Sequence, residues 1–553
     1  MKQILEETFM KLNKKVVGIT LASTLALGSL GFSSANEKVE AKKDSQKAKN
    51  VIVLVMDGVS SSTTTLARWY KGQPLAMDEI LTGGVRTYSA ESAITDSAPA
   101  GTAMATGNKS NDKFVGVLPE KVANPGVDPD LADNPYKPVA NVLEGAKISG
   151  KATGIVSTSE IQHATPAAFS SHAAHRSDYD NIAEQQVYQD MDVVLGGGKN
   201  SLLAENRKDG ENLVEVIDNK GYDLVETREE LLKSKSSKLW GSFAPSALAY
   251  DMDREQTNPD EPTLAEMTNK AISTLSKDKD GFFLFVEGSK PDWAAHANDP
   301  IGMISDTLSF DAAVKEALDF AKKNKNTMIV AVSDHGNSGI SIGNQNTSGS
   351  YPSIPVSTYI DPLKEAEMTL EGALKQLKSD KSNVLEVAAL YGIDNPTQEE
   401  TKAVQQSKDL GKTLVQLLAN RANIGFTTGG HTGEDLFLYS YGPGSPTGLV
   451  ENTEIAHTAA KAMGFDLKKL DNQVFVNAEA EFKKIGAKVK VDSSDANNPV
   501  LVVTKGKTNA QFPVNKNVLI LNGKEIDLDT VTVRSNEEFY VSKEAIQLVK
   551  KGK

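Results

Sequence analysis

Carboxylates and histidines recur together in this sequence at spacings that suit a metal ion. Asp292 and His296 stand four residues apart behind Pro291, a residue suited to the first turn of a helix. That spacing puts both side chains on one helix face, where they could hold one metal. The chain has no cysteine, so carboxylate and imidazole are the strong ligands that remain, and this combination suits Zn²⁺. Standing alone, such a pair would more often be a surface ion pair.

Four short apolar runs predict the strands that must position these side chains: residues 51–55, 281–286, 327–332 and 436–441. Continuous apolarity is typical of strands covered on both faces. Residues 311–322 lie between the second and third runs and have helical spacing of their apolar residues. This order predicts an α/β fold, a three-layer sandwich around a mainly parallel central sheet.

Polar residues follow the first three runs directly, namely Asp57, Glu287, Asp334 and His335. Sites in open α/β sheets form outside the carboxyl ends of the strands, so we expect these four side chains to converge. Asp and Gly also end strands as ordinary turn formers. Three such ends, with Glu and His among them, favour a site.

Ser97 opens a run of small residues and is expected at the start of a helix, where free backbone N–H groups favour an anion. Taken alone, the segment is more typical of a plain helix cap. A serine hydroxyl becomes a good nucleophile only beside a base or a metal, so metal activation is the natural partner. Arg176 offers a planar fork that matches two phosphate oxygens. His172 and His175 are expected to pack or to face solvent.

The first 35 residues have the pattern of a secretory signal peptide. A basic stretch ends at Lys15, residues 16–32 are apolar, and small residues precede a cleavage point after Ala35. A retained membrane anchor is the alternative, but the glycine, serine and threonine residues inside the stretch make it a poor permanent span. We expect an exported protein, secreted to the extracellular space or associated with the cell wall.

The 553 residues are then divided into a large domain and an appendage. Residues 36–486 form the main domain, with a helix-rich excursion at about 360–420, and residues 487–553 read as a small β-rich module. This module is basic, with 11 Lys and Arg against 8 Asp and Glu, although the whole chain has a net charge of −13. The acidic balance argues against nucleic-acid-specific binding. The module could tether the protein to anionic cell-wall polymer or act as a stabilising flap.

Five separated motifs closely resemble those of the alkaline phosphatase family. In chain order they read VIVLVMDGVS, TDSAPAGTAMATG, VSTSEIQHATPAAFSSHAAHR, VEGSKPDWAAHAND with VSDHGN, and TTGGHTGED, and they span roughly residues 48–470. The resemblance implies a hydrolase of small-molecule phosphate monoesters with two Zn²⁺ ions and a third, usually Mg²⁺, site. It also implies that Ser97 is the nucleophile that forms a phosphoserine and that Arg176 clamps the phosphoryl group.

The same resemblance assigns ligands to each ion. One zinc would be held by Asp292, His296 and His431, the other by Asp57, Asp334 and His335, and the third ion by Asp57, His163, Thr165 and Glu287. The sequence departs from the best-known enterobacterial pattern at two positions, with His163 in place of Asp and Trp293 in place of Lys. Because imidazole can also ligate an ion directly, the third ion could be Mg²⁺, Zn²⁺ or Co²⁺, and we expect Mg²⁺.

Two alternative functions are compatible with the sequence. Phosphodiesterases, sulfatases and phosphoglycerate mutases with related folds share the two-metal core, and an exported phosphate-binding or surface-attachment protein would carry an inert version of it. The C-terminal module faintly resembles accessory domains of the copper-amine-oxidase N-terminal type, but residues 487–553 contain no histidine or cysteine to bind copper. A monomer and a homodimer are both compatible with the sequence.

Overall fold

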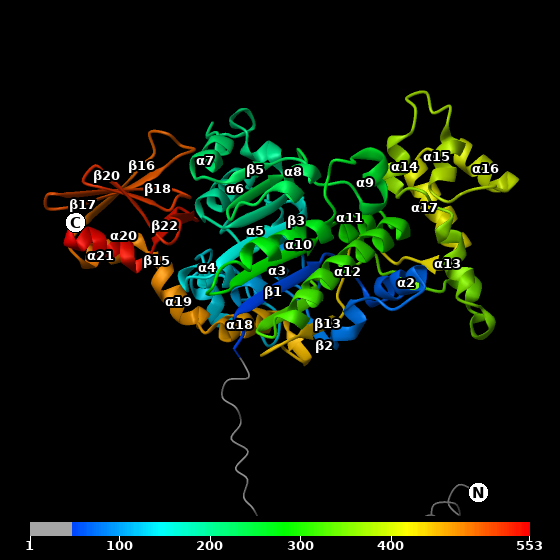
Figure 1. The fold of residues 1–553 in the computed structure, drawn as a ribbon, viewed down its shortest axis with the longest axis horizontal. Coiled ribbons are helices and arrows are strands. Elements are labelled where there is room, and N and C mark those ends of the chain that lie inside the picture. The colour runs from blue at the N-terminus through cyan, green and yellow to red at the C-terminus, as the bar shows by residue number, and fades with distance from the viewer. Residues whose placement is uncertain (1–46, 553) are drawn as a thin grey trace, which may run out of the picture. The chain divides into compact units, whose positions relative to one another are not determined.

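A ten-stranded sheet forms the centre of the molecule (Figure 1). The computed structural model describes residues 47–552, so the predicted signal peptide lies outside the described part. The strand order is β14-β2-β13-β8-β1-β7-β3-β4-β6-β5. Their bounds are β1 (Asn50–Met56), β2 (Leu81–Arg86), β3 (Ala152–Glu160), β4 (Val193–Gly197), β5 (Asp223–Val225), β6 (Leu239–Ser242), β7 (Phe282–Gly288), β8 (Thr327–Ser333), β13 (Leu436–Tyr441) and β14 (Gly448–Glu451).

The predicted runs are all strands of this sheet, and the α/β prediction is confirmed. β1 lies at the centre, with β7 and β8 parallel on its two sides. The fourth run, β13, is antiparallel to both of its neighbours, so the sheet is mainly parallel with one reversed strand.

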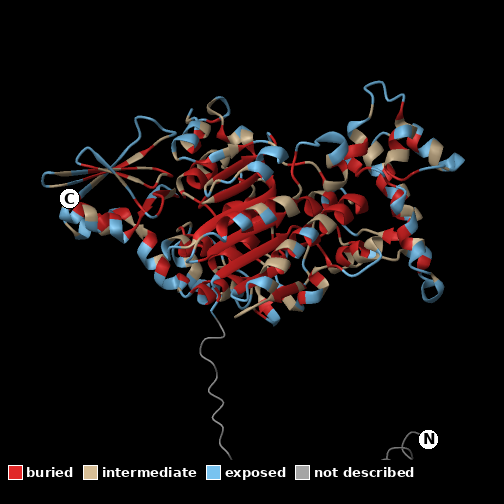
Figure 2. Cartoon of the chain, in the orientation of Figure 1, coloured by how far each residue is buried: buried red, intermediate tan, exposed pale blue. Residues whose placement is uncertain are grey.

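Helices cover both faces of the sheet, which makes the sandwich three-layered. Val51, Val53 and Val55 point into one apolar core, and the alternate residues of β1 point into the other. The central strands β1, β7 and β8 are therefore buried along their whole length (Figure 2). The first core is closed by α3 (Ser97–Thr106), α4 (Val142–Ile148), α6 (Tyr179–Tyr188), α7 (Leu213–Asn219) and α18 (Asn452–Met463); the second by α8 (Arg228–Lys233), α10 (Leu264–Leu275) and α12 (Pro300–Lys323).

The helical excursion has a core of its own, which also takes in part of α12 and α11 (Lys290–His296). It comprises α13 (Ser357–Lys364), α14 (Leu370–Lys375), α15 (Val384–Leu390), α16 (Gln398–Gln405) and α17 (Leu410–Arg421). Asp299, at the start of α12, fastens it, because its carboxylate accepts hydrogen bonds from the N–H of Leu370 and the hydroxyl of Tyr391. No helix among the described residues is both long and apolar enough to cross a membrane.

The C-terminal module is built on antiparallel strands. Its sheet runs β16 (Lys488–Asp492), β17 (Val500–Lys505), β18 (Thr508–Pro513), β19 (Val518–Leu521) and β20 (Lys524–Asp527), and a smaller one joins β15 (Val476–Asn477), β22 (Glu538–Val541) and β21 (Val533–Ser535). Asn522 and Gly523 both have positive φ in the tight turn that the sequence indicates. Ser542 caps α21 (Lys543–Lys551). The module's core begins before residue 487, because Phe482 of α20 (Ala478–Lys484) packs into it.

Candidate active site

The carboxyl ends of β1 and β8 bring together three of the predicted ligands. Met56 is paired with Ser333, so Asp57 and Asp334 leave the sheet side by side. Nε2 of His335 lies 3.3 Å from Oδ1 of Asp57 and 3.4 Å from Oδ2 of Asp334. Asp334 is fixed by the N–H of Gly58, which donates to its Oδ1 at 3.1 Å. All three side chains are buried.

Glu287 reaches the same place from β7. The register pairs it with Val55 on one side and Ser157 on the other, and the Ser157 hydroxyl donates to its Oε2 at 2.6 Å. Thr165 lies on α5 (Ala164–Ala168), directly after the loop that carries His163. Atoms of Asp57, His163 and Glu287 lie within 4.8 Å of one another, which brings the predicted third-ion ligands together.

Asp292 and His296 lie on α11, and His431 lies on β12 (His431–Thr432), which pairs with β9 (Gly336–Asn337) beside His335. Nε2 of His296 is 3.4 Å from Oδ2 of Asp292 and 3.2 Å from Nε2 of His431, and the latter is 3.6 Å from Oδ1 of Asp292. The structure therefore brings together all three residues predicted for this zinc. His335 also belongs here, since its ring stacks on that of His431 at 3.7 Å between centroids.

Backbone carbonyls orient two of these histidines. Nδ1 of His431 is 2.8 Å from the carbonyl oxygen of Thr95, and Nδ1 of His296 is 2.9 Å from that of Gly429. A carbonyl can only accept, so each Nδ1 carries the proton and each Nε2 is left to ligate an ion.

Ser97 is the first residue of α3 and is buried beside the cluster. Its Oγ is 3.2 Å from Nε2 of His335. Arg176 reaches the same region from a loop, where Nη1 donates to Asp96 at 2.5 Å and Nη2 donates to Nε2 of His163 at 3.0 Å. The predicted phosphate clamp is thus bonded to Asp96, the residue directly before the predicted nucleophile in the chain.

The site concentrates negative charge in a buried space. Burial, reinforced by Asp334 and Asp292, raises the pKa of Asp57 well above its usual value. Burial also raises the pKa of Asp334 to about 7, with repulsion from Asp292 adding to it, and raises the pKa of Glu287 to about 7. Carboxyls packed this closely can all be ionised only when a cation lies among them.

Unpartnered polar atoms show where such cations fit. Within the described chain, hydrogen-bond partners are missing for the buried atoms Asp57 Oδ1 and Oδ2, Glu287 Oε1, Asp334 Oδ2, Thr165 Oγ1 and His163 Nδ1. A buried carboxylate oxygen or hydroxyl without a partner is costly, so their gathering at one point is the signature of a metal centre. The oxygen-rich part around Glu287 suits a hard cation, and the imidazole-rich part around His431 suits Zn²⁺.

The other two histidines beside Arg176 lie outside the cluster, as expected. His172 is buried between Glu144, at 3.0 Å, and the carbonyl oxygen of Gly116, at 2.8 Å. His175 contacts Ser177 near the surface.

Several residues that support the site escaped the sequence reasoning. Asp96 holds Arg176, Ser157 holds Glu287, and Asn337 donates to Oδ1 of Asp292 at 2.7 Å. Asp96 stands next to Ser97, and Ser157 is the second residue of a quoted motif, so their positions in the sequence were a usable signal for both. The carbonyl of Thr95 acts on a histidine 336 residues away, and no sequence pattern marks such a partner.

Comparison with known proteins agrees with this fold and this site. The alkaline phosphatase family matches residues 48–465, and the chain belongs to that family. The resemblance predicted from the motifs is thereby confirmed, and the protein is an enzyme of this kind. Residues 458–549 match a second family, the copper amine oxidase N-terminal domain.

Individual relatives give the same result. Alkaline phosphatase 3 of Bacillus subtilis is 39% identical over 488 residues, which cover 83% of this chain and 99% of that protein. Alkaline phosphatase 4 of the same organism is 36% identical, covering 82% and 98%. Among solved structures, the alkaline phosphatase of Thermus thermophilus superimposes with a TM-score of 0.66 at 28% identity, covering 76% of this chain and 92% of that one.

Proposed function

We propose that the protein hydrolyses phosphate monoesters through a phosphoserine on Ser97, at a centre that holds two Zn²⁺ ions and one Mg²⁺ ion. The observation that carries this is the position of the Ser97 hydroxyl. It lies at the start of α3, 3.2 Å from His335 and beside buried carboxylates that need a cation. A related-fold phosphodiesterase or sulfatase and an inert phosphate-binding protein are the alternatives that experiment must separate.

The residues present fit the three ions. Asp292, His296 and His431 would hold one zinc; Asp57, Asp334 and His335 the other; Asp57, Thr165 and Glu287, with His163, the third ion. When bound, the ions supply positive charge that favours the ionised serine and stabilises the oxygen of the leaving group. In the structure of the alkaline phosphatase from the Antarctic bacterium TAB5, a histidine-to-aspartate variant has Mg bound in its M3 site.

The chain's own residues carry the steps. Ser97 Oγ gives its proton to solvent water and attacks phosphorus, the bond from phosphorus to the ester oxygen breaks, and the leaving alkoxide takes a proton from solvent water and departs as the alcohol. A water molecule then attacks the phosphorus of the phosphoserine, the bond from phosphorus to Oγ breaks, one proton of that water passes to Oγ, and hydrogen phosphate is released. Arg176 exchanges its bonds to Asp96 and His163 for two phosphate oxygens, and the first N–H groups of α3 face the same charge.

The test is p-nitrophenyl phosphate hydrolysis by the purified, metal-loaded enzyme. We expect Ser97→Ala to lower kcat by about a thousandfold or more, since it removes the nucleophile. Ser348→Ala, at an exposed position outside the cluster, is the matched control. Acid-quenched enzyme incubated with ³²P-labelled substrate should retain label only when Ser97 is present. Retained activity in Ser97→Ala, or faster turnover of a diester or a sulfate ester, would overturn the assignment.

We further propose that the enzyme is exported and associates with the cell wall through the tip of its C-terminal module. Three turns meet there: Lys505 donates to the carbonyl of Lys550 at 3.3 Å, and Asn522 donates to that of Gly552 at 3.4 Å. This lysine tip consists of Lys505, Lys507, Lys524, Lys550 and Lys551. Four of the five side chains are exposed, so the tip complements a polyanion.

The lysine tip is tested by replacing Lys507, Lys524 and Lys551 with glutamate. We expect the variant to lose binding to purified bacterial cell walls at low salt while its turnover stays unchanged. Walls stripped of their anionic polymer should bind neither form. Unchanged binding of the variant would refute the tether and leave the alternative that the module is a stabilising flap. Light scattering on the same preparations decides between monomer and homodimer.

A further inference from the structure

The C-terminal module inserts one buried side chain into the main domain. Asn515 lies in the loop between β18 and β19 and is 2% exposed, with a left-handed φ of +62°. Its amide nitrogen donates to Oδ1 of Asn181 at 2.7 Å and to Oε2 of Glu184 at 2.8 Å, both on α6. Its Oδ1 accepts a hydrogen bond from Gln185 at 3.1 Å. Module and main domain are therefore joined here by specific, desolvated hydrogen bonds.

Gln185 connects Asn515 to the loop that carries Arg176, because it also bonds to His172 at the start of that loop. Its Oε1 accepts from the backbone N–H of His172 at 2.8 Å, and its Nε2 donates to the carbonyl of the same residue at 2.8 Å. One amide thus satisfies both backbone groups of His172, as a neighbouring strand would. Asn515 holds that amide in place, because its oxygen accepts from the same nitrogen.

Arg176 follows four residues later. Between the two, Ala173 pairs with Val115, and the N–H of Arg176 donates to the carbonyl of Lys113 at 2.8 Å. The loop is held at its start by Gln185, which bonds the backbone of His172, and by Glu144 and Gly116, which bond its ring. Further on it is held by residues 113–115. Loss of the Gln185 bonds removes the backbone part of the first hold, so we expect the guanidinium of Arg176 to be less precisely placed.

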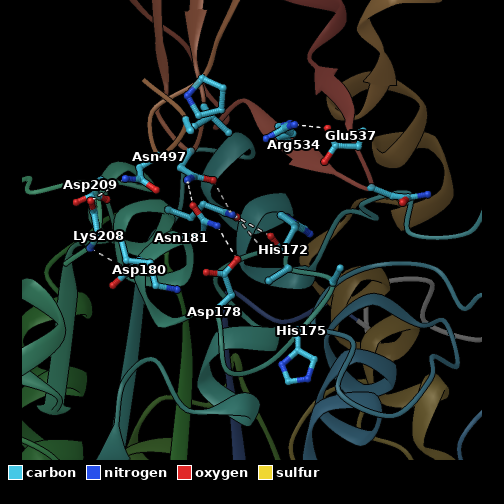
Figure 3. Close-up of a pocket in the computed structure, with 18 residues that line it drawn as sticks. His172, His175, Asp178, Asp180, Asn181, Lys208, Asp209, Asn497, Arg534 and Glu537 are labelled. Carbon is cyan, nitrogen blue, oxygen red and sulfur yellow. Dashed lines mark hydrogen bonds and ion pairs between the residues drawn. The ribbon is translucent and has the colours of Figure 1, made fainter. Parts of the chain in front are cut away.

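Figure 3 shows the space that lies beside this contact. A cavity of about 380 Å³ separates the loop from the module, and His172, His175, Asp178 and Asn181 line it from one side and Arg534 from the other. Along this cavity no side chains fill the gap between loop and module, so here the two are joined by the hydrogen bonds through Gln185 and Asn515. The ring of His172 is held separately, by Glu144, Gly116 and the ring of Phe475.

We infer that Asn515 is a positioning residue for Arg176, so that the C-terminal module raises the affinity of the enzyme for the phosphoryl group. This rests on the proposed function, in which Arg176 holds the phosphate oxygens. It extends the module beyond a tether, since a side chain 339 positions later in the sequence supports the binding site.

The experiment uses Asn515→Gly in the full-length, metal-loaded enzyme. Glycine keeps the left-handed backbone and removes only the side chain. We expect the KM for p-nitrophenyl phosphate and the Kd for inorganic phosphate, measured by calorimetry, to rise about three- to tenfold, with a smaller change in kcat. Asn522→Gly is the matched control, because it is also left-handed but bonds only within the module.

Two further variants separate positioning from general damage. Asn515→Asp keeps an oxygen that can accept from Gln185, so its KM should stay nearer the wild-type value. In an Arg176→Ala background, Asn515→Gly should add no further loss of phosphate affinity. If Asn515→Gly fails to fold, Gln185→Glu removes the donor to His172 and should give the same rise in Kd.

The outcomes also distinguish this inference from the proposed function. Unchanged KM and Kd in both Asn515→Gly and Gln185→Glu would refute the positioning role while leaving the enzyme's chemistry intact. An equal loss of affinity in the Arg176→Ala background would refute it as well. If the wild-type enzyme bound phosphate but hydrolysed no monoester, the proposed function would fail, and the calorimetric Kd values would still test Asn515.

Discussion

Arg176 and the proposed third metal ion compete for the imidazole ring of His163. Its Nε2 accepts from Arg176, and a guanidinium only donates, so the proton of the neutral ring lies on Nδ1. Burial, together with the positive charge of Arg176, lowers the pKa of His163 to about 3, which keeps the ring neutral. Trp293 packs edge-on against it at 5.8 Å between ring centroids. A third ion that binds this imidazole must displace either the arginine or the proton.

The change His163→Asp should remove this competition. A carboxylate offers oxygens to Mg²⁺ and can pair with Arg176 at the same time. We expect the Mg²⁺ concentration that restores half of the activity, after chelation and with Zn²⁺ held constant, to fall about tenfold. His175→Asp, on the same loop, serves as the control. A variant that still responds equally to Co²⁺ and Mg²⁺ would contradict the expectation.

Close approach of two elements sets the geometry of the residues that we propose as zinc ligands. Gly58 follows β1 with φ +70°, and a Cβ placed there would lie 2.5 Å from Oδ1 and 2.7 Å from Cα of Asp292 on α11. Only glycine lets the end of the strand and the start of the helix come this near. The distance between the two proposed groups of zinc ligands therefore depends on the absence of a side chain at residue 58.

Gly58→Ala and Gly72→Ala form a matched pair at this scale. Both positions are left-handed, so each alanine costs about 1 kcal/mol of backbone strain, but nothing lies within 4 Å at Gly72. We expect Gly72→Ala to keep full activity. Gly58→Ala should lose at least about tenfold in kcat and bind less zinc in elemental analysis. Equal behaviour of the two variants would show that the approach at Asp292 does not matter.

The strands of the central sheet and the residues at their ends could be predicted from the sequence. A continuous apolar run predicts a strand reliably when both faces of that strand are buried. A residue that directly follows such a run then lies at the carboxyl end of the strand, as Asp57 and Asp334 do. The orientation of side chains and the direction of individual strands could not be predicted from the sequence. His431 is turned by a carbonyl of residue 95, and the reversed direction of β13 depends on its neighbours β2 and β8 rather than on its own residues.

At the scale of the whole molecule, the contact between the module and the main domain contains a buried acid. Burial, with Glu211 nearby, raises the pKa of Glu184 to about 8, although Lys516 lies 3.4 Å away. In the folded protein Glu184 then keeps its proton at neutral pH, whereas in the unfolded chain it ionises near its usual value. The unfolded state holds fewer protons between about pH 4.5 and pH 8, so this group makes stability fall as pH rises through that window.

Glu184→Gln should flatten this part of the stability profile. The expected result is a melting temperature that declines less between pH 5 and pH 8 than that of the wild-type holoenzyme, because the side chain no longer titrates. Differential scanning calorimetry at fixed ionic strength and metal concentration measures it. Parallel profiles for the two proteins would show that Glu184 is already ionised in the fold.

Chelation should lower the melting temperature as well as the activity. Ions that bind only the folded state stabilise it by about 2.7 kcal/mol at a hundredfold excess over Kd, and the chain has no disulfide to compensate. We expect a fall of several degrees in excess EDTA, reversed by Zn²⁺ plus Mg²⁺. An unchanged melting curve would mean that the buried carboxylates are neutralised by protons instead.

The ligands of the metal centre are spread from Asp57 to His431, and this spread sets the order in which the protein can mature. A ribosome releases the first ligand long before the last, so no growing chain can hold the full set of ions until nearly all of the main domain has been synthesised. Asn515, which holds the loop of Arg176, comes later still. We therefore expect no hydrolysis of phosphate esters before the whole main domain has been synthesised, and the residue that we propose to position Arg176 is made after that domain.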